Sequence, residues 1–285
     1  MSLLTKLLSH RLRGFGAPEN SQAAMEAACA AGIPYLEIDT RVADDRTIYV
    51  SHDPRTDAVS DAPGSGASDA SRDRLTPAKS GAMFELQDAL RIFSSRSQAQ
   101  QRLCIDIKDY GWEEAHLDLV RAAGVEQRVC FISWIPQTIL RLHALGTKSP
   151  LILSYFELGR FGAVGRVADR IFRNRCIRIG SWVLMGDGRY GDASGENVCG
   201  FNYGLCSSGL PSGLVRVLRE SGGGICVQRH LVSQALIRRC EEQGLQLWTF
   251  SVRSLSQFLH DAQQPGIDVV FCDEAGGVVR GLGRE

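Results

Sequence analysis

The sequence contains no long apolar run, no excess of either charge and no closely spaced cysteine pair. A membrane-spanning helix needs roughly 18 to 20 consecutive apolar residues, so a helix of that kind is excluded. Lysine and arginine together number 32, as do aspartate and glutamate, which leaves no overall field to attract a polyanion. We therefore expect no nucleic-acid partner.

The nine cysteines are an odd number, and none of them belongs to a C-x-x-C pair. Cys199 and Cys206 lie too far apart, and lack the companion ligands, for a zinc site. Five others lie inside apolar stretches, as small buried hydrophobic residues do in a reducing compartment: Cys29, Cys104, Cys130, Cys226 and Cys272. This usage favours a cytoplasmic location.

Short apolar segments alternate with amphipathic stretches along the 285 residues, of which 44% are apolar. The predicted strands are 7–11, 35–42, 48–52, 103–108, 129–133, 151–155, 200–203 or 225–228, 246–251 and 268–272. The predicted helices are 21–31, 84–93, 111–123, 136–145, 211–220, 232–243 and 254–262. Strand then helix, repeated about eight times, predicts an α/β fold, a (β/α)8 TIM barrel that forms a single domain over residues 1–285. An open doubly wound sheet is the alternative, but no G-x-G-x-x-G opens a helix after a strand.

Two regions interrupt this alternation, and we expect both to be loop insertions. Residues 57–81 are rich in Ser, Asp, Ala and Gly, whereas residues 186–224 are Gly-rich and carry Tyr190, Phe201 and Tyr203. Loops that follow barrel strands surround the active site, so either region could contact a substrate. A tolerated insertion is the alternative for both.

A run of six arginines without a lysine occupies residues 160–178. Arg166, Arg170 and Arg173 would share one face of a helix. Such a stripe is most often the solvated outer face of a barrel helix. Contact with a membrane surface or with phosphate is the alternative.

The strand predicted at residues 35–42 carries two acids, Glu37 and Asp39, that project from one face because side chains alternate along a strand. Two carboxylates that share a buried face repel each other, and they need a proton or a cation between them. A divalent metal ion is the obvious candidate.

Four predicted strand ends carry polar residues that an ordinary core would not place there: His10-Arg11, Glu37-x-Asp39, His52-Asp53 and Asp106-x-Lys108. In a barrel, these ends meet at one mouth. All-oxygen ligands select a hard cation, Mg²⁺ or Ca²⁺, over zinc. Two histidines can supply a general base and a general acid, and the arginine and lysine add positive charge, so the composition is that of a phosphate-ester site.

In order and in approximate spacing, these residues resemble the glycerophosphodiester phosphodiesterase family. That family has His-Arg-Gly, Pro-Glu-Asn-Thr, Glu-x-Asp, His-Asp and Glu-x-Lys boxes. The corresponding residues here are His10-Arg11, Pro18-Glu19-Asn20-Ser21, Glu37-Ile38-Asp39, His52-Asp53 and Asp106-Ile107-Lys108, followed by Leu247-Trp248-Thr249 and a closing box at residues 266–273. The similarity covers nearly the whole chain.

The resemblance implies a (β/α)8 barrel that hydrolyses a phosphodiester with one divalent cation. It also implies attack by a neighbouring substrate hydroxyl, which gives a cyclic phosphate that water can then open. By position, Glu37, Asp39 and Asp106 would bind the metal, His10 and His52 would be the acid and base, Arg11 and Lys108 would hold the phosphate, Glu19 and Asn20 would support the site, and Trp248 would line the pocket.

Two residues depart from the family pattern. Leu12 stands where the family has glycine, so we expect the loop after the first strand to take another path, with Gly14 and Gly16 supplying the freedom that is lost. Asp106 stands where most members have glutamate and is one methylene shorter, which requires the metal or the strand to shift.

Several other polar and aromatic residues have ordinary structural interpretations. We expect Ser21 to cap a helix, Asp273 to be a turn or cap residue, and Trp134 and Trp182 to serve packing. The remaining histidines lie away from the charged strand ends, and we expect them to be surface or structural residues: His116, His143, His230 and His260.

The leading hypothesis is a metal-dependent enzyme that hydrolyses a small glycerol- or sugar-linked phosphodiester to a phosphomonoester and an alcohol. One alternative is a lysophospholipase D-like enzyme that acts on membrane lipid. Another is a barrel that binds phosphate esters without turnover. The sequence leaves open the leaving alcohol, the choice between Mg²⁺ and Ca²⁺, the separate roles of the histidines and the oligomeric state.

Overall fold

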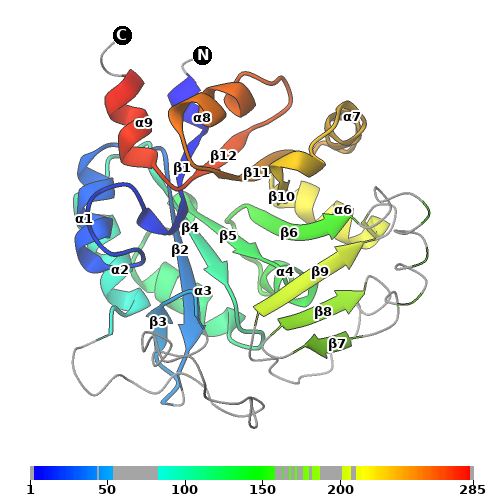
Figure 1. Cartoon of the computed structure of the whole chain (residues 1–285). Helices are drawn as coiled ribbons and strands as arrows, with labels where there is room; N and C mark the ends of the chain where they lie inside the picture. The colour runs from blue at the N-terminus through cyan, green and yellow to red at the C-terminus, as the bar shows by residue number, and fades with distance from the viewer. Residues whose placement is uncertain are drawn as a thin grey trace, which may run out of the picture.

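Eight parallel strands close into a barrel, which confirms the predicted (β/α)8 fold (Figure 1). The computed structural model describes residues 3–43, 45–53, 83–157, 176–179, 182–186, 201–206 and 210–282, together with Ala163, Val167 and Ile171. Around the barrel, the strands are β1 (Leu7–Ser9), β2 (Tyr35–Val42), β4 (Arg102–Ile107), β5 (Val129–Ser133), β6 (Leu151–Glu157), β10 (Gly224–Gln228), β11 (Gln246–Val252) and β12 (Val269–Cys272). Pairing of β12 with β1 and of β10 with β6 completes the ring.

Helices follow the barrel strands and cover the outside of the ring (Figure 1). They are α1 (Gln22–Ala30), α2 (Leu86–Arg96), α3 (Glu113–Ala122), α4 (Pro136–Ala144), α6 (Ser212–Glu220), α7 (Gln234–Gln243), α8 (Leu255–Ala262) and α9 (Ala275–Leu282). Short 3-10 helices lie at η1 (Leu3–Lys6), η2 (His10–Leu12), η4 (Glu126–Arg128) and η7 (Arg229–Leu231). The Ser21 hydroxyl accepts a hydrogen bond from the Ala24 N–H, which confirms the predicted cap. No helix in the described ranges combines the length and the hydropathy that a membrane span requires.

The strands bury side chains on both faces, which is why they read as nearly continuous apolar runs. The larger core lies between the barrel and the helices and includes Leu36, Ile38 and Phe93. A smaller core fills the barrel interior with Leu8, Cys104, Cys130, Ile132, Ile152, Cys226, Trp248, Val269 and Phe271. The five cysteines expected to be buried are buried and reduced.

The predicted strand at residues 48–52 forms, but it lies outside the barrel. Strand β3 (Ile48–Val50) pairs antiparallel with the end of β2, where Val50 opposes Thr40. The hairpin doubles back over β2, and His52 follows β3 directly. This reversal brings the chain beside Asp39, whose carbonyl oxygen accepts a hydrogen bond from the Ser51 N–H at 2.9 Å, and places His52 among the residues at the barrel mouth.

Strand β6 belongs to the barrel for only part of its length. Its residues 152–154 pair with β10, whereas residues 155–157 pair with β9 (Phe201–Cys206). Strands β8 (Trp182–Gly186) and β7 (Cys176–Ile179) continue this side sheet beyond the barrel (Figure 1). The strand therefore leaves the ring near its C-terminal end, next to the barrel mouth.

Several sequence expectations fall outside the described residues. All of 57–81 does so, as do 187–200 and 207–209 within the region 186–224; the described parts of that region include β9 and α6. Arg166, Arg170 and Arg173 also lie outside them. On the same stretch, Val167 is 62% exposed and Ile171 is 48% exposed.

Between residues 11 and 16, the turn after β1 has a left-handed backbone at four positions. Leu12 keeps a left-handed φ of 58° although its side chain is fully buried, and Gly14 and Gly16 have φ values of 97° and 73°. The two glycines thus supply the freedom expected of them, but Leu12 itself adopts a conformation that favours glycine. Arg11, at φ 53°, is the fourth such residue.

Gly14 also permits a close approach to the start of α9. A Cβ at this position would lie 2.8 Å from the Ala275 nitrogen and 2.9 Å from the Gly276 nitrogen, whereas a Cβ on Gly16 would meet nothing within 4 Å. We expect Gly14→Ala to lower the free energy of unfolding by about 2 to 4 kcal/mol through strain and overpacking. Urea unfolding measures this change.

Gly16→Ala is the matched control, because it imposes left-handed strain alone, which costs about 1 to 2 kcal/mol. Equal losses in the two variants would show that the contact with α9 adds nothing.

His116 is fully buried between α3 and β2. Its Nδ1 lies 2.8 Å from the Trp112 carbonyl oxygen, which can only accept, and its Nε2 lies 3.0 Å from the Thr40 hydroxyl. The ring is thus satisfied as a neutral imidazole. Burial lowers the pKa of His116 to about 4 from an ordinary value of 6.5. This histidine is structural, as expected.

A depressed histidine pKa makes stability depend on pH. Between its folded and unfolded pKa values the unfolded chain binds a proton that the folded chain does not, so stability falls as the pH falls. We expect His116 to account for a loss of about 2 kcal/mol between about pH 7.5 and about pH 5. Urea unfolding at both pH values measures it, with His116→Gln as the comparison. If the variant shows the same pH dependence as the wild type, His116 is not the cause.

Candidate active site

One pocket, with a volume of about 230 Å³, opens at the C-terminal ends of the barrel strands. Seven of the described residues that line it are charged or carry imidazole: His10, Arg11, Glu37, Arg41, His52, Asp106 and Lys108. The other seven are Trp134, Ser154, Phe156, Cys226, Gln228, Phe250 and Phe271. Residues from all four polar segments noted in the sequence therefore meet at one mouth: three segments lie at the ends of barrel strands, and β3 brings His52 to the same place.

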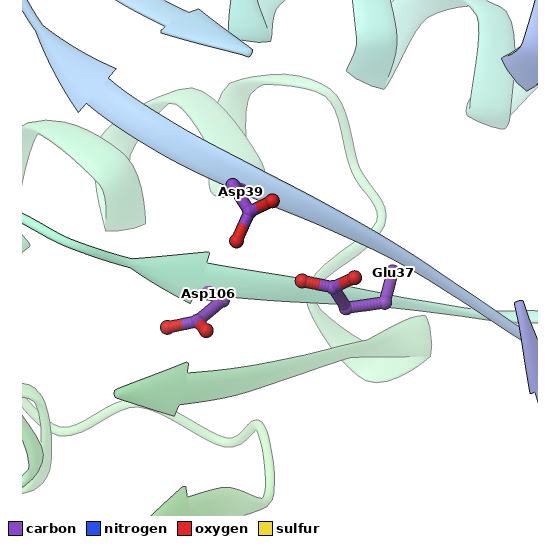
Figure 2. Close-up of side chains that lie close together, drawn as sticks. All are labelled: Glu37, Asp39 and Asp106. Atoms are coloured by element: carbon purple, nitrogen blue, oxygen red, sulfur yellow. The ribbon is translucent and has the colours of Figure 1, made fainter. Parts of the chain in front are cut away.

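The three predicted metal ligands converge beneath this mouth (Figure 2). Glu37 and Asp39 extend from β2, and Asp106 extends from the paired position on β4, opposite Asp39. One carboxylate oxygen from each residue lies within 4.8 Å of the others. All three residues are buried.

Positive groups neutralise this cluster unevenly. The Lys108 Nζ lies 2.8 Å from Asp39 Oδ1 and 2.5 Å from Asp106 Oδ2, and the Arg11 Nε lies 3.3 Å from Asp39 Oδ2. Glu37 accepts only a backbone hydrogen bond in the described region, from the Arg11 N–H at 2.6 Å. The cations are thus closest to Asp39 and Asp106.

This asymmetry separates the pKa values of the two acids on β2. Burial raises the pKa of Glu37, and the charges of Asp39 and Asp106 raise it further, well above its ordinary value. Burial acts in the same direction on Asp39, but Lys108 and Arg11 outweigh it and lower the pKa of that carboxyl. An excess proton in the cluster therefore resides on Glu37. Burial would lower the pKa of Lys108, but Asp106 and Asp39 raise it, so the ammonium stays charged.

Asn20 and Glu19 support this cluster from the segment before α1. The Asn20 side chain donates to Asp39 Oδ2 at 2.9 Å and accepts from the Asp39 N–H at 3.3 Å. Glu19 lies farther out and forms ion pairs with Arg11 and Arg13. Both residues hold the charged groups in place, and neither is part of the described pocket lining.

His10 is oriented by an acid from the other end of the chain. Its Nδ1 lies 2.7 Å from Asp273 Oδ1, and the Arg13 Nη1 lies 3.1 Å from the same oxygen. Burial raises the pKa of Asp273, but the hydrogen bond and charge of His10, together with Arg13, lower it below its ordinary value. Asp273 lies in the turn between β12 and α9, as expected, and is in addition the partner of His10.

His52 is also paired with a carboxylate. Its Nδ1 lies 2.8 Å from Asp53 Oδ1. Burial lowers the pKa of His52, and the charges of Lys108 and Arg11 add to this, against the opposing effect of Asp39. Neutral imidazole is therefore the favoured form near neutral pH.

Arg41 is a site residue that the sequence reasoning did not identify. It follows Glu37 and Asp39 on the same face of β2 and is 1% exposed. Its Nη1 donates to Asp109 at 2.8 Å, and its Nε donates to the His52 carbonyl oxygen at 3.1 Å. The alternation of residues 37, 39 and 41 could have identified it. The contact fixes the backbone that carries His52.

The aromatic residues of the site differ from expectation. Trp248 does not line the pocket: it is 1% exposed and lies in the barrel interior, 6.2 Å from the Phe271 ring centroid, so its role is support. Phe250, two residues later on β11, lines the pocket in its place. Trp134, expected to serve packing, also lines it; Trp182 has no described side chain.

The acid cluster fits a hard divalent cation. Its donors are all oxygens, and the buried Asp106 Oδ1 accepts no hydrogen bond from any described residue. A buried carboxylate oxygen without a partner is costly, and a cation would satisfy it. The shorter side chain of Asp106 still reaches the cluster. Glu37, Asp39 and Asp106 are therefore the residues that could hold a metal ion.

The sequence matches the model of the glycerophosphoryl diester phosphodiesterase family over residues 10–276. A comparison with curated proteins gives no match. Among solved structures, the chain is similar to a phosphodiesterase from Oleispira antarctica in complex with the product sn-glycerol-3-phosphate, with 15% identity, a TM-score of 0.60, and 98% and 96% of the two chains covered. It is also similar to a glycerophosphodiester phosphodiesterase from Agrobacterium tumefaciens, with 16% identity, a TM-score of 0.57, and 96% and 99% covered. At these identities the structures establish the shared fold.

If the acid cluster binds a cation, Asp106→Asn should weaken Mg²⁺ or Ca²⁺ affinity by about tenfold or more, because it removes an anionic oxygen ligand. Isothermal titration calorimetry of each ion into the purified protein measures the affinity.

Asp118→Asn is the matched control, since Asp118 is an exposed acid on α3. An unchanged affinity in Asp106→Asn would remove Asp106 from the ligand set, and an equal loss in both variants would show an unspecific charge effect.

Proposed function

Because the chain belongs to the glycerophosphoryl diester phosphodiesterase family and is a phosphoric diester hydrolase, we propose that its substrate is a small glycerol- or sugar-linked phosphodiester. The products are a phosphomonoester and an alcohol. The observation that carries the proposal is the placement of two carboxylate-bound imidazoles, His10 and His52, around one buried acid cluster. The sn-glycerol-3-phosphate bound to the Oleispira antarctica phosphodiesterase supports a glycerol-linked substrate.

Glu37, Asp39 and Asp106 would hold one divalent cation, Mg²⁺ or Ca²⁺. When bound, this ion neutralises phosphate oxygens and stabilises the charge that develops during phosphoryl transfer. Asn20 keeps Asp39 in position through two hydrogen bonds. Because the pKa of Glu37 is raised, protonation of this carboxylate competes with metal binding.

Arg11 and Lys108 line the pocket and would hold the phosphate. Both cations already contact acids of the cluster, so their positions are set before substrate arrives. A fixed positive charge lowers the cost of reorganisation in the transition state. In this arrangement Arg11 and Lys108 bind the non-bridging oxygens of the diester.

The environments of the histidines suggest separate roles. His52, whose lowered pKa keeps it neutral, takes the proton of the substrate hydroxyl next to the ester. His10, which Asp273 holds in place, acts as the acid and gives a proton to the leaving alcohol. A new O–P bond forms as the ester O–P bond breaks, giving a cyclic phosphate. Water then opens the cyclic ester with the proton transfers reversed.

We expect chelator-sensitive hydrolysis when the protein is mixed with Mg²⁺ or Ca²⁺ and a pool of glycerol and sugar phosphodiesters. Phosphorus NMR identifies the diester that is lost and any cyclic phosphate that accumulates. His10→Ala and His52→Ala should each lower turnover by about 10² to 10⁴-fold, as the loss of a general acid or base does.

His260→Ala is the control, because His260 is an exposed histidine on α8. Wild-type turnover in either site variant would remove that histidine from the mechanism. Survival of every diester in the presence of bound metal would contradict the proposed substrate class.

A further inference from the structure

The pocket has two chemically distinct halves. Every charged or imidazole residue in the described lining comes from the first part of the chain, between His10 and Lys108. The described lining residues from Trp134 onward carry no charged group, and only Ser154 and Gln228 among them offer a hydroxyl or an amide. We call the part lined by residues between His10 and Lys108 the acid half; it lies at the ends of β1, β2 and β4. The second half lies at the ends of β5, β6, β10, β11 and β12.

Four aromatic rings form a continuous row along the second half, which we call the aromatic wall: Trp134, Phe156, Phe250 and Phe271. Trp134 packs against Phe156 at 5.1 Å and against Phe250 at 5.6 Å between ring centroids. Phe250 is 6.4 Å from Phe271. The wall comes from four different strands or strand ends, so barrel closure brings it together.

The wall reaches the proposed proton donor. The Phe271 ring lies 5.7 Å from the His10 ring in an edge-to-face arrangement. A group that leaves phosphorus with a proton from His10 would therefore lie against the aromatic wall rather than against the acid cluster. In such a complex the wall would contact the leaving alcohol.

We propose that the aromatic wall is a subsite for an apolar leaving group, so that the preferred substrate is a phosphodiester of an aryl or alkyl alcohol. This inference rests on the proposed hydrolysis with His10 as the acid. An amino alcohol or a polyol in this half would lose water and find few partners in the described lining, whereas an aryl or alkyl group gains burial.

A quaternary ammonium group is the competing occupant, because aromatic rings also bind such cations. Two observations disfavour it. Phe250 packs edge to face with both Trp134 and Phe271, so in each of these pairs one ring edge already covers part of the other ring's face. No carboxylate in the described part of this half balances a positive charge. An apolar group needs neither an open ring face nor a counter-charge.

The test compares esters of sn-glycerol 3-phosphate with benzyl alcohol, n-butanol, n-dodecanol, ethanolamine and choline, using the metal-loaded enzyme. Release of glycerol 3-phosphate gives kcat/KM for each ester. We expect the benzyl ester to exceed the ethanolamine ester by about tenfold or more, as differences in apolar contact allow. Trp134→Ala and Phe250→Ala should each reduce this ratio by about tenfold.

The ratio of kcat/KM for the benzyl ester to that for the ethanolamine ester is measured on one enzyme preparation. Any unfolded enzyme lowers both values equally and does not change the ratio. Phe84→Ala is the matched control, because Phe84 is equally half-buried but lies outside the described lining, and it should keep the wild-type ratio. A higher kcat/KM for the dodecyl ester than for the butyl ester would identify a lipid as the source of the apolar group. Equal values would identify a short-chain alcohol as the source. Both results support the subsite.

Three outcomes would overturn the inference. An ethanolamine ester cleaved as fast as the benzyl ester would remove the apolar subsite while leaving the hydrolase function intact. Preference for the choline ester that is lost in Phe250→Ala would assign the wall to a cation. No cleavage of any ester by the wild-type enzyme would instead contradict the proposed function on which the inference depends.

Discussion

The site depends on one electrostatic constraint: three carboxylates lie within 4.8 Å of one another and away from water. Two neighbouring strands present these acids because Asp39 and Asp106 occupy paired positions. Repulsion at this distance must be balanced: Lys108 and Arg11 lie beside Asp39, and the pKa of Glu37 is raised by burial and by its acidic neighbours. Nearby contacts hold these groups in place: Asn20 donates to Asp39, and Arg41 donates to the His52 carbonyl oxygen.

The strand pairing that closes the barrel also brings His10 and Asp273 together. Strand β1 pairs with β12 so that Ser9 opposes Cys272. His10 directly follows β1, and Asp273 directly follows β12. The register of the β1–β12 pair therefore places the two side chains side by side, with His10 Nδ1 2.7 Å from Asp273 Oδ1. A shift of register at this seam would separate the imidazole from its acid.

Much of the fold follows from local pattern. Residues 35–42 alternate in polarity and form β2 with the predicted bounds, and the acids, histidines and cations noted in the sequence meet at one mouth. What local pattern cannot supply is a partner that lies far along the chain. Asp273 sits in an ordinary strand-end sequence, and its partner is 263 residues away. Local pattern also does not show how deep in the barrel a side chain lies. Trp248 and Phe250 share one face of β11, but only Phe250 lines the pocket. The antiparallel return of β3 also depends on pairing rather than composition.

The division of β6 lets the two halves of the pocket change separately. Residues 152–154 complete the ring with β10, whereas residues 155–157 begin the side sheet, and the chain returns through α6 to β10. An insertion or deletion in the segment between Phe156 and α6 breaks no strand pairing of the acid half, which lies on β1, β2 and β4. A change in this segment can thus alter the surroundings of Phe156 while the strand pairs that hold the acid cluster stay intact.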